Sequence, residues 1–207
     1  MSWYVGFDCA IKTFAFSISY IDLELYKKDR KGNLNYKNYV NKYLKILDGD
    51  MECFYPNIKD EDINIVMRCK AVAKYIEKRI KPSIIKYCDI NPKIMIEFQM
   101  GANQRARAIV ATIITMFVDY DIHIIGATLK NKIYTSPKGK YYLFAEKYKT
   151  SYTANKSHAL FNFQQIEQLF DSQISKNISL KNRGHIADSF IQILGYIIYG
   201  KNQSLYF

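Results

Sequence analysis

The stretch KIMIEFQMGANQRARAIVATIITMFVDYDIHIIGATL, residues 93–129, has the pattern of a strand, a helix and a second strand. Residues 92–98 form a nearly uninterrupted apolar run, which favours a strand buried on both faces, and a second β-prone run covers 122–129. The apolar residues between them recur at helical spacing: Ile109, Val110, Ile113, Ile114, Phe117 and Val118. A crossover helix between two strands predicts a parallel pair and places the chain in the α/β class.

Two β-prone runs, residues 2–8 and 13–21, precede this unit and are separated by a short break, which predicts an antiparallel hairpin. A polar, basic excursion covers 24–61, with a further strand expected around 39–47. Helical spacing predicts three more helices, at residues 62–80, 155–170 and 184–199. We therefore expect one domain over residues 1–207, with a mixed sheet, antiparallel N-terminal strands and flanking helices.

Details of three predicted helices bear on packing. The helix at 62–80 is expected to end there because Pro82 follows it. The apolar stripe of the helix inside 93–129 either packs on its own sheet or forms an interface between two copies of the chain. In the helix at 155–170, one side is apolar and consists of Leu160, Phe163, Ile166 and Phe170.

The charge balance of the chain favours a polyanionic partner. Its 207 residues include 30 Lys and Arg against 19 Asp and Glu, a net charge of +11, which suits nucleic acid or an anionic membrane surface. No apolar run approaches the roughly 20 residues of a membrane span, so we expect no membrane partner. The four cysteines form no CxxC pair and the three histidines are scattered, which argues against structural zinc and predicts free thiols. Without an export signal at the N-terminus, we expect an intracellular protein.

Two carboxylates stand at the ends of predicted strands. Asp8 ends the run WYVGFD, and Glu97 ends KIMIE. In an open α/β sheet ligands bind beyond strand ends, and two carboxylates meeting there would repel each other unless a cation joined them. Mg²⁺ selects such oxygen ligands. The alternative is that each acidic residue only ends its strand, as Asp often does at turns.

The last predicted helix carries a second polar group. Ile186, Phe190, Ile193 and Ile197 form one side of a helical wheel, and the opposite side holds a polar cluster of His185, Asp188 and Gln192. An acidic residue in a first helical turn also simply favours the helix dipole. Together with the strand ends, the chain offers four candidate ligands for two-metal phosphoryl chemistry: Asp8, Glu97, His185 and Asp188.

Three segments resemble the acidic motifs of the RuvC-like Holliday junction resolvases, with the poxvirus branch and its mitochondrial fungal relatives most similar. They are GFDCAIKTFAFSI (6–18), IMIEFQMGANQRARAI (94–109) and GHIADSFIQIL (184–194). Many members carry Asp where this chain has His185, so this residue is either a metal ligand or a base that positions water. The positions that match the motifs are Gly6, Asp8, Lys12, Ala15, Glu97, Gln99, Asn103, Arg105, His185 and Asp188.

The resemblance implies an RNase H-like fold and a homodimeric endonuclease that cuts four-way DNA junctions by paired symmetric nicks. It implies 5′-phosphate and 3′-hydroxyl products, and two Mg²⁺ or Mn²⁺ ions held by Asp8, Glu97, His185 and Asp188. A catalytic lysine is expected after the strand that follows Glu97, at Lys130 or Lys132, with Lys156 as a looser candidate. The residues expected to contact DNA are Lys12, Gln99, Asn103, Arg105, Arg107, Lys138, Lys140 and Lys156.

Two alternatives stay open from the residues alone. A different RNase H-like nuclease, acting on RNA–DNA hybrids or flaps, would share every acidic ligand, and a non-catalytic DNA-binding protein would share the basic charge. A nucleotide cofactor is not expected, because no Gly-rich phosphate loop follows the opening strands. A viral protein of this kind would work in the host-cell cytoplasm, and one of the fungal type in mitochondria.

Overall fold

The computed structural model describes residues 2–10, 12–22, 44–98, 104–133, 137–166 and 178–199. These residues contain a five-stranded sheet of order β3-β2-β1-β4-β5. The pairs β1–β2 and β2–β3 are antiparallel, whereas β1–β4 and β4–β5 are parallel, which confirms the predicted mixed α/β sheet. The strands are β1 (Ser2–Cys9), β2 (Thr13–Ile21), β3 (Leu44–Cys53), β4 (Lys93–Phe98) and β5 (Ile122–Gly126).

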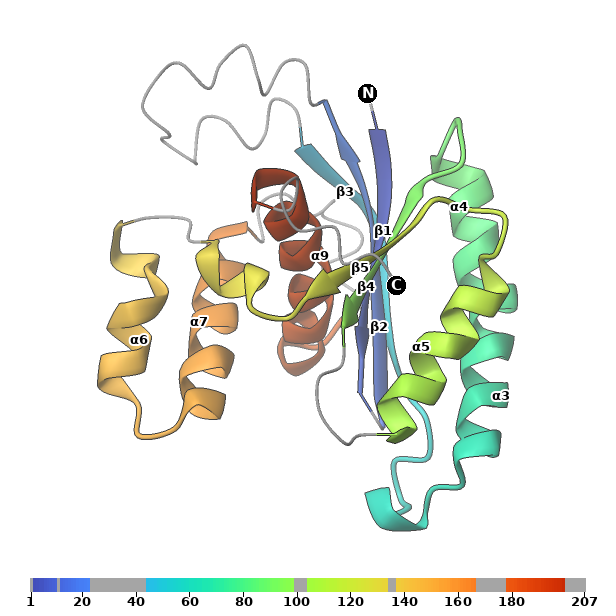
Figure 1. Ribbon diagram of the computed structural model, residues 1–207, viewed down its shortest axis with the longest axis horizontal. Helices are drawn as coiled ribbons and strands as arrows, with labels where there is room; N and C mark the ends of the chain where they lie inside the picture. Colours follow the sequence, from blue (N-terminus) through green and yellow to red (C-terminus); the bar gives the residue numbers. More distant parts are fainter. Residues whose placement is uncertain are drawn as a thin grey trace.

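Helices cover both faces of the sheet (Figure 1). One face carries α3 (Ile65–Tyr75), a π-helical turn (Ile76–Ile80), α4 (Lys81–Tyr87) and α5 (Gln104–Met116). The other face carries α9 (Leu180–Tyr199), with α7 (Ser151–Ile166) and α6 (Tyr141–Lys147) lying outside it. Short 3₁₀ turns cover Asp60–Asp62, Leu129–Lys132 and Pro137–Gly139. Across the described ranges, no helix is both long and apolar enough to cross a bilayer.

The strands bury side chains on both faces, as expected for a sheet between two helical layers. Val5 and Phe7 of β1 belong to the cluster under α3 and α5, whereas Tyr4 belongs to the cluster under α9. Gly6 lies on the α9 side, where a Cβ atom would be only 2.1 Å from the carbonyl oxygen of Ser189. The absence of a side chain at Gly6 therefore lets α9 lie directly on the strand that ends in Asp8.

Several predicted element bounds were wrong. β3 covers Leu44–Cys53, so the strand expected at 39–47 lies further along the chain and occupies part of the expected 24–61 excursion. Residues 23–43 lie outside the described part. Pro82 does not end the helix, because it stands in the first turn of α4, where no intrahelical N–H bond is required. The strand expected at 122–129 ends at Gly126.

The helix expected at 155–170 begins earlier, at Ser151, and the positions from 167 to 170 lie outside the described residues. Its expected apolar side was wrong at Leu160, which is 49% exposed. Its buried side instead holds Ala154, His158 and Asn162, each at most 2% exposed. The stripe of α5 packs on its own sheet through Ile109 and Ile113, whereas Val118, past the end of α5, is 72% exposed.

Candidate active site

Asp8 and Glu97 lie at matching positions on neighbouring parallel strands. Phe7 of β1 is paired with Ile96 of β4, and both side chains belong to the cluster under α3 and α5. Because successive residues of a strand point to opposite faces, the next residue of each strand points to the α9 side. The two carboxylates are therefore presented together to the N-terminal part of α9.

Asp8 accepts a hydrogen bond from the ring of His185, with 2.8 Å between Asp8 Oδ2 and His185 Nδ1. Both side chains are mostly buried, at 15% and 21% exposure. The bond fixes the imidazole orientation and leaves Nε2 as the ring atom that is available to a proton or a ligand. This is the arrangement of a histidine that is held in place by a carboxylate.

Glu97 has two partners at one oxygen. Gln192 donates from Nε2 to Glu97 Oε2 at 2.6 Å, and the Lys130 ammonium nitrogen lies 3.4 Å from the same atom. Burial raises the pKa of Glu97; Lys130 opposes this effect and the charge of Asp8 adds to it. Burial alone would lower the pKa of Lys130, but the carboxylates of Asp188, Glu97 and Asp8 outweigh it and raise that pKa.

Asp188 is the carboxylate with the weakest compensation. Its Oδ1 is buried and has no hydrogen-bond partner. Burial raises the pKa of Asp188 to about 7, with Lys130 lowering it and the charges of Asp8 and Glu97 raising it further. Three acidic side chains thus share one region with too little positive charge from the protein to neutralise them all.

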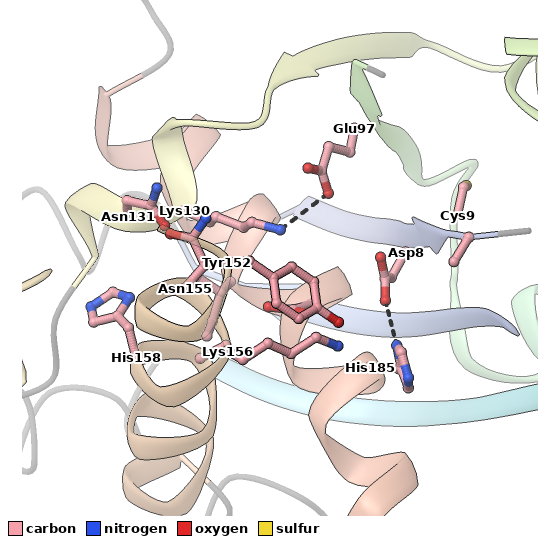
Figure 2. Close-up of a pocket in the computed structure, with 14 residues that line it drawn as sticks. Asp8, Cys9, Glu97, Lys130, Asn131, Tyr152, Asn155, Lys156, His158 and His185 are labelled. Carbon is pink, nitrogen blue, oxygen red and sulfur yellow. Dashed lines mark hydrogen bonds and ion pairs between the residues drawn. The ribbon is translucent and has the colours of Figure 1, made fainter. Parts of the chain in front are cut away.

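The carboxylates, His185 and Lys130 line one cavity of about 450 Å³, a size within the range of ligand pockets. Asp8, Glu97, His185 and Asp188 all line it. Lys130 enters from the 3₁₀ turn after β5, and α7 adds a further wall (Figure 2). The residues of that wall are Tyr152, Asn155, Lys156, His158 and Ala159.

Buried polar contacts of α7 hold the segment that carries Lys130. Asn162 donates from Nδ2 to the carbonyl of Ile133 at 3.1 Å. His158 lies with Nε2 3.0 Å from the carbonyl of Gly139, and burial lowers its pKa, an effect that the backbone carbonyls oppose. On the other side, a Cβ atom on Gly195 of α9 would lie 3.1 Å from the backbone of Leu129, so the two elements are closely packed.

Arg68 of α3 supports the turn after Asp8. Its Nη2 donates to the carbonyl of Ala10 at 2.9 Å, and its guanidinium carbon lies 4.2 Å from the centroid of the Phe54 ring. The side chain is fully buried, which lowers the pKa of Arg68 to about 10. A buried cation here ties the β1–β2 turn to the helical layer behind the sheet.

The structure separates the remaining predicted site residues into distinct places. Lys130 and Lys156 line the cavity, whereas Lys132 and Lys12 are not among the described residues that do. Arg105 donates to the carbonyl of Glu61 at 2.9 Å. Arg107 and Lys138 are exposed, and Lys140 directly precedes α6 without a capping hydrogen bond from its side chain. Gln99 and Asn103 lie outside the described residues.

Tyr152, Asn155 and Gln192 were not predicted to be site residues, yet each lies at the cavity or bonds a residue that lines it. Gln192 shared the polar side of its helix with His185 and Asp188, a signal that could have assigned it. Tyr152 and Asn155 stand at helical spacing with Lys156, but the predicted helix began at 155 and so excluded Tyr152.

The donor chemistry of the cavity fits a hard divalent cation. Carboxylate oxygens are the ligands that Mg²⁺ and Mn²⁺ prefer, and both Asp188 Oδ1 and Gln192 Oε1 are buried oxygens without a hydrogen-bond partner. Among the described residues, no three His, Cys, Asp or Glu side chains are already gathered closely enough to form an ion site. Binding would therefore require the carboxylates to draw together.

No family model matches the chain, and no curated protein matches it in sequence. Two solved structures of junction resolvases match it over nearly the whole length. RuvC of Thermus thermophilus in complex with Holliday junction substrate matches with a TM-score of 0.54 and 9% identity, covering 98% of this chain and 97% of that one. Fowlpox virus resolvase with substrate Holliday junction DNA matches with a TM-score of 0.50 and 15% identity, covering 96% and 99%.

The chain thus has the fold of the RuvC-like resolvases, an RNase H-like fold, as the sequence motifs predicted. Particular closeness to the poxvirus branch stays a prediction, because RuvC and the viral enzyme match over similar shares of the chain.

Proposed function

We propose that this protein is a structure-selective endonuclease that resolves four-way DNA junctions by metal-dependent hydrolysis. The observation that carries the proposal is the cavity itself: Asp8, Glu97 and Asp188 come from three separate elements and line it together with Lys130 and Lys156. The sequence motifs and the likeness to two resolvases, each solved with junction DNA, support the choice of substrate. The net charge of +11 supports a polyanionic partner.

In this proposal each group in the cavity has a role that follows from its charge. Lys130 and Lys156 attract the scissile phosphate and offset the charge that develops on it. His185, held through Nδ1 by Asp8, offers Nε2 for a proton or a ligand. Asp8, Glu97 and Asp188 would hold Mg²⁺ or Mn²⁺, two ions in the full site, with His185 as a further ligand. Bound metal supplies an activated water and stabilises the leaving 3′-oxygen.

The proposal includes a homodimer that makes paired, symmetric nicks with 5′-phosphate and 3′-hydroxyl ends. A four-way junction has approximate two-fold symmetry, which a dimer with C₂ symmetry matches. Sealing of the nicked arms by DNA ligase without end processing tests the product chemistry. Cutting both opposite strands of one junction within a single binding event tests the dimer.

The decisive experiment compares wild type with Glu97→Gln on a labelled four-way junction in Mg²⁺. The variant is expected to bind the junction and to cut it about 100-fold more slowly or worse, because it loses a buried acidic ligand. Glu52→Gln is the matched control, since Glu52 is an exposed glutamate on β3 of the same sheet. Ca²⁺ is expected to support binding without cleavage, and chelator is expected to stop cleavage.

Other outcomes select the alternatives. Strong cutting of RNA–DNA hybrids or flaps with none of junctions would identify a different RNase H-like nuclease. Binding without cleavage of any substrate in Mg²⁺ or Mn²⁺ would identify a non-catalytic DNA-binding protein. Equal cutting by wild type and Glu97→Gln would place the active site elsewhere.

A further inference from the structure

The wall that α7 adds to the cavity carries a large aromatic side chain, Tyr152. Residues 152, 155, 156 and 159 line the cavity and follow the spacing of one helix face. Tyr152 is 70% exposed, so core packing does not account for its position. Apart from the imidazoles of His158 and His185, it is the aromatic member of a lining that otherwise consists largely of acidic, basic and amide side chains.

The cavity has a charged part and, beside it, an aromatic part formed by Tyr152. The Lys156 ammonium nitrogen lies 5.7 Å from the centroid of the Tyr152 ring, one helical turn further along α7. Figure 2 shows both side chains extending from α7 toward the region of Asp8 and His185. The charged part, with two lysines and three carboxylates, suits a phosphate and its cations, whereas the exposed ring offers a flat face beside it.

We propose that Tyr152 stacks on the unpaired nucleobase next to the scissile phosphate and so holds the cut strand in the cavity. The inference rests on the proposed nuclease function and deepens it. A base is joined to its phosphate through one sugar, so a phosphate held at the carboxylates brings the adjacent base near the α7 wall. Stacking on an aromatic face accepts any base, which suits an enzyme that reads structure rather than sequence.

The same contact contributes to selectivity for branched DNA. In an intact duplex each base is stacked on its neighbours and paired, and taking it out costs a few kcal/mol. At a branch point the bases are more easily unstacked, so the Tyr152 face is reached at lower cost. Tyr152 therefore acts as a positioning residue that favours strands with an accessible base beside the cut.

The test is a double-mutant cycle in which one change is made in the protein, at Tyr152, and the other in the DNA, at the nucleotide next to the cut. Tyr152→Ala and Tyr152→Phe are compared with wild type on a junction with a normal nucleotide, or an abasic one, next to the mapped cut. Tyr152→Ala is expected to raise KM or lower the cleavage rate by about tenfold, and Tyr152→Phe is expected to retain wild-type rates. The abasic substrate is expected to slow wild type to the same extent, with no further loss in Tyr152→Ala.

A second arm does not depend on cleavage. In Glu97→Gln with Ca²⁺, 5-iododeoxyuridine placed beside the cut is expected to cross-link to Tyr152 under long-wavelength ultraviolet light, as mapped by mass spectrometry. Tyr142→Ala is the matched control, since Tyr142 is a 53% exposed tyrosine on neighbouring α6 that does not line the cavity.

Failure of the inference and failure of the proposed function give different results. Independent, additive losses from Tyr152→Ala and the abasic site, or a cross-link that maps away from Tyr152, would overturn the stacking contact while wild-type cleavage stands. A wild-type protein that cuts none of the DNA substrates would overturn the nuclease function itself. Losses from Tyr142→Ala equal to those from Tyr152→Ala would reduce the effect to general surface binding and also overturn the inference.

Discussion

Lys130 places its ammonium nitrogen 3.4 Å from Glu97 Oε2 and opposes the rise in pKa of both Glu97 and Asp188. The sequence left a choice between this residue and Lys132, with Lys156 as a looser candidate. The structure brings Lys130 and Lys156 into the cavity lining and leaves Lys132 out of it. The reason is the 3₁₀ turn Leu129–Lys132, because residues two apart in such a turn point in different directions.

We predict that Lys130→Gln lowers junction cleavage about 100-fold, as expected when one charged group that faces the reacting phosphate is removed. Loss of its charge also raises the pKa values of Glu97 and Asp188 further, so the rise of the rate with pH is expected to move to higher pH. Single-turnover rates from pH 6 to 9 measure both effects. The control is Lys78→Gln, an exposed lysine in the helical layer on the other face of the sheet. A larger loss in Lys132→Gln would assign the role to Lys132 instead.

Among the elements, the π-helical turn between α3 and α4 has a clear structural task. It places Arg79 against β3, where the guanidinium donates to both oxygens of Asp48, at 2.6 and 2.8 Å, and to Asp50 at 3.1 Å. Asp48 is 7% exposed, and its pKa is lowered because hydrogen bonds from Arg79 and Ser83 outweigh the effect of burial. The π-helical turn therefore positions the Arg79 guanidinium so that it pairs with both oxygens of Asp48, a buried carboxylate on the edge strand β3 of the described sheet.

We predict that Arg79→Lys lowers the free energy of unfolding by about 2 kcal/mol, less than the 3–5 of a fully buried pair because Arg79 is one-third exposed. A lysine cannot donate to both oxygens of Asp48 and to Asp50 together. Urea unfolding followed by far-ultraviolet circular dichroism measures the change. Lys81→Gln, which removes an exposed pair with Glu77, is expected to change stability by less than about 0.5 kcal/mol. Equal effects of the two substitutions would show that the Arg79 fork adds nothing beyond a surface pair.

At the level of the whole molecule, the buried carboxylates that the proposed chemistry needs lower the stability of the fold when they are charged. Burial raises the pKa of Asp188 from an ordinary value near 3.8 to about 7. A carboxyl with a raised pKa in the folded state stabilises the fold while it stays protonated. That stabilisation is present below pH 4 and is lost as the pH rises through about 7.

We predict that, in chelator, Asp188→Asn makes the protein more stable than wild type at pH 8 by about 1–3 kcal/mol, and that the difference shrinks toward pH 5. The amide removes a buried charge while keeping the shape of the side chain. Millimolar Mg²⁺ is expected to stabilise wild type more than the variant, because cation binding to the folded state requires the carboxylate. Urea unfolding at pH 5, 6.5 and 8, with and without Mg²⁺, measures this. A stability difference that does not change with pH would contradict the raised pKa.

Local sequence patterns were enough to predict the antiparallel opening strands, the parallel crossover and the four candidate ligands Asp8, Glu97, His185 and Asp188, which the structure brings to one cavity. Alternating and helical spacings record which side of each element avoids water. These signals are local, so they were reliable for the presence and pairing of the strands, whereas the predicted bounds of β3 and β5 were wrong.

Tertiary packing alone decided which sides of the helices meet. Gly6 lets α9 lie against β1, and the buried His158 and Asn162 of α7 bond to the segment that brings Lys130 to Glu97. Buried polar residues that bond to distant carbonyls have the same appearance in a sequence as exposed ones, so the apolar side predicted for α7 was wrong at Leu160. The sequence likewise did not place Tyr152 beside the carboxylates, because the carboxylates come from β1, β4 and α9, whose residues line one cavity with α7 only in the folded chain.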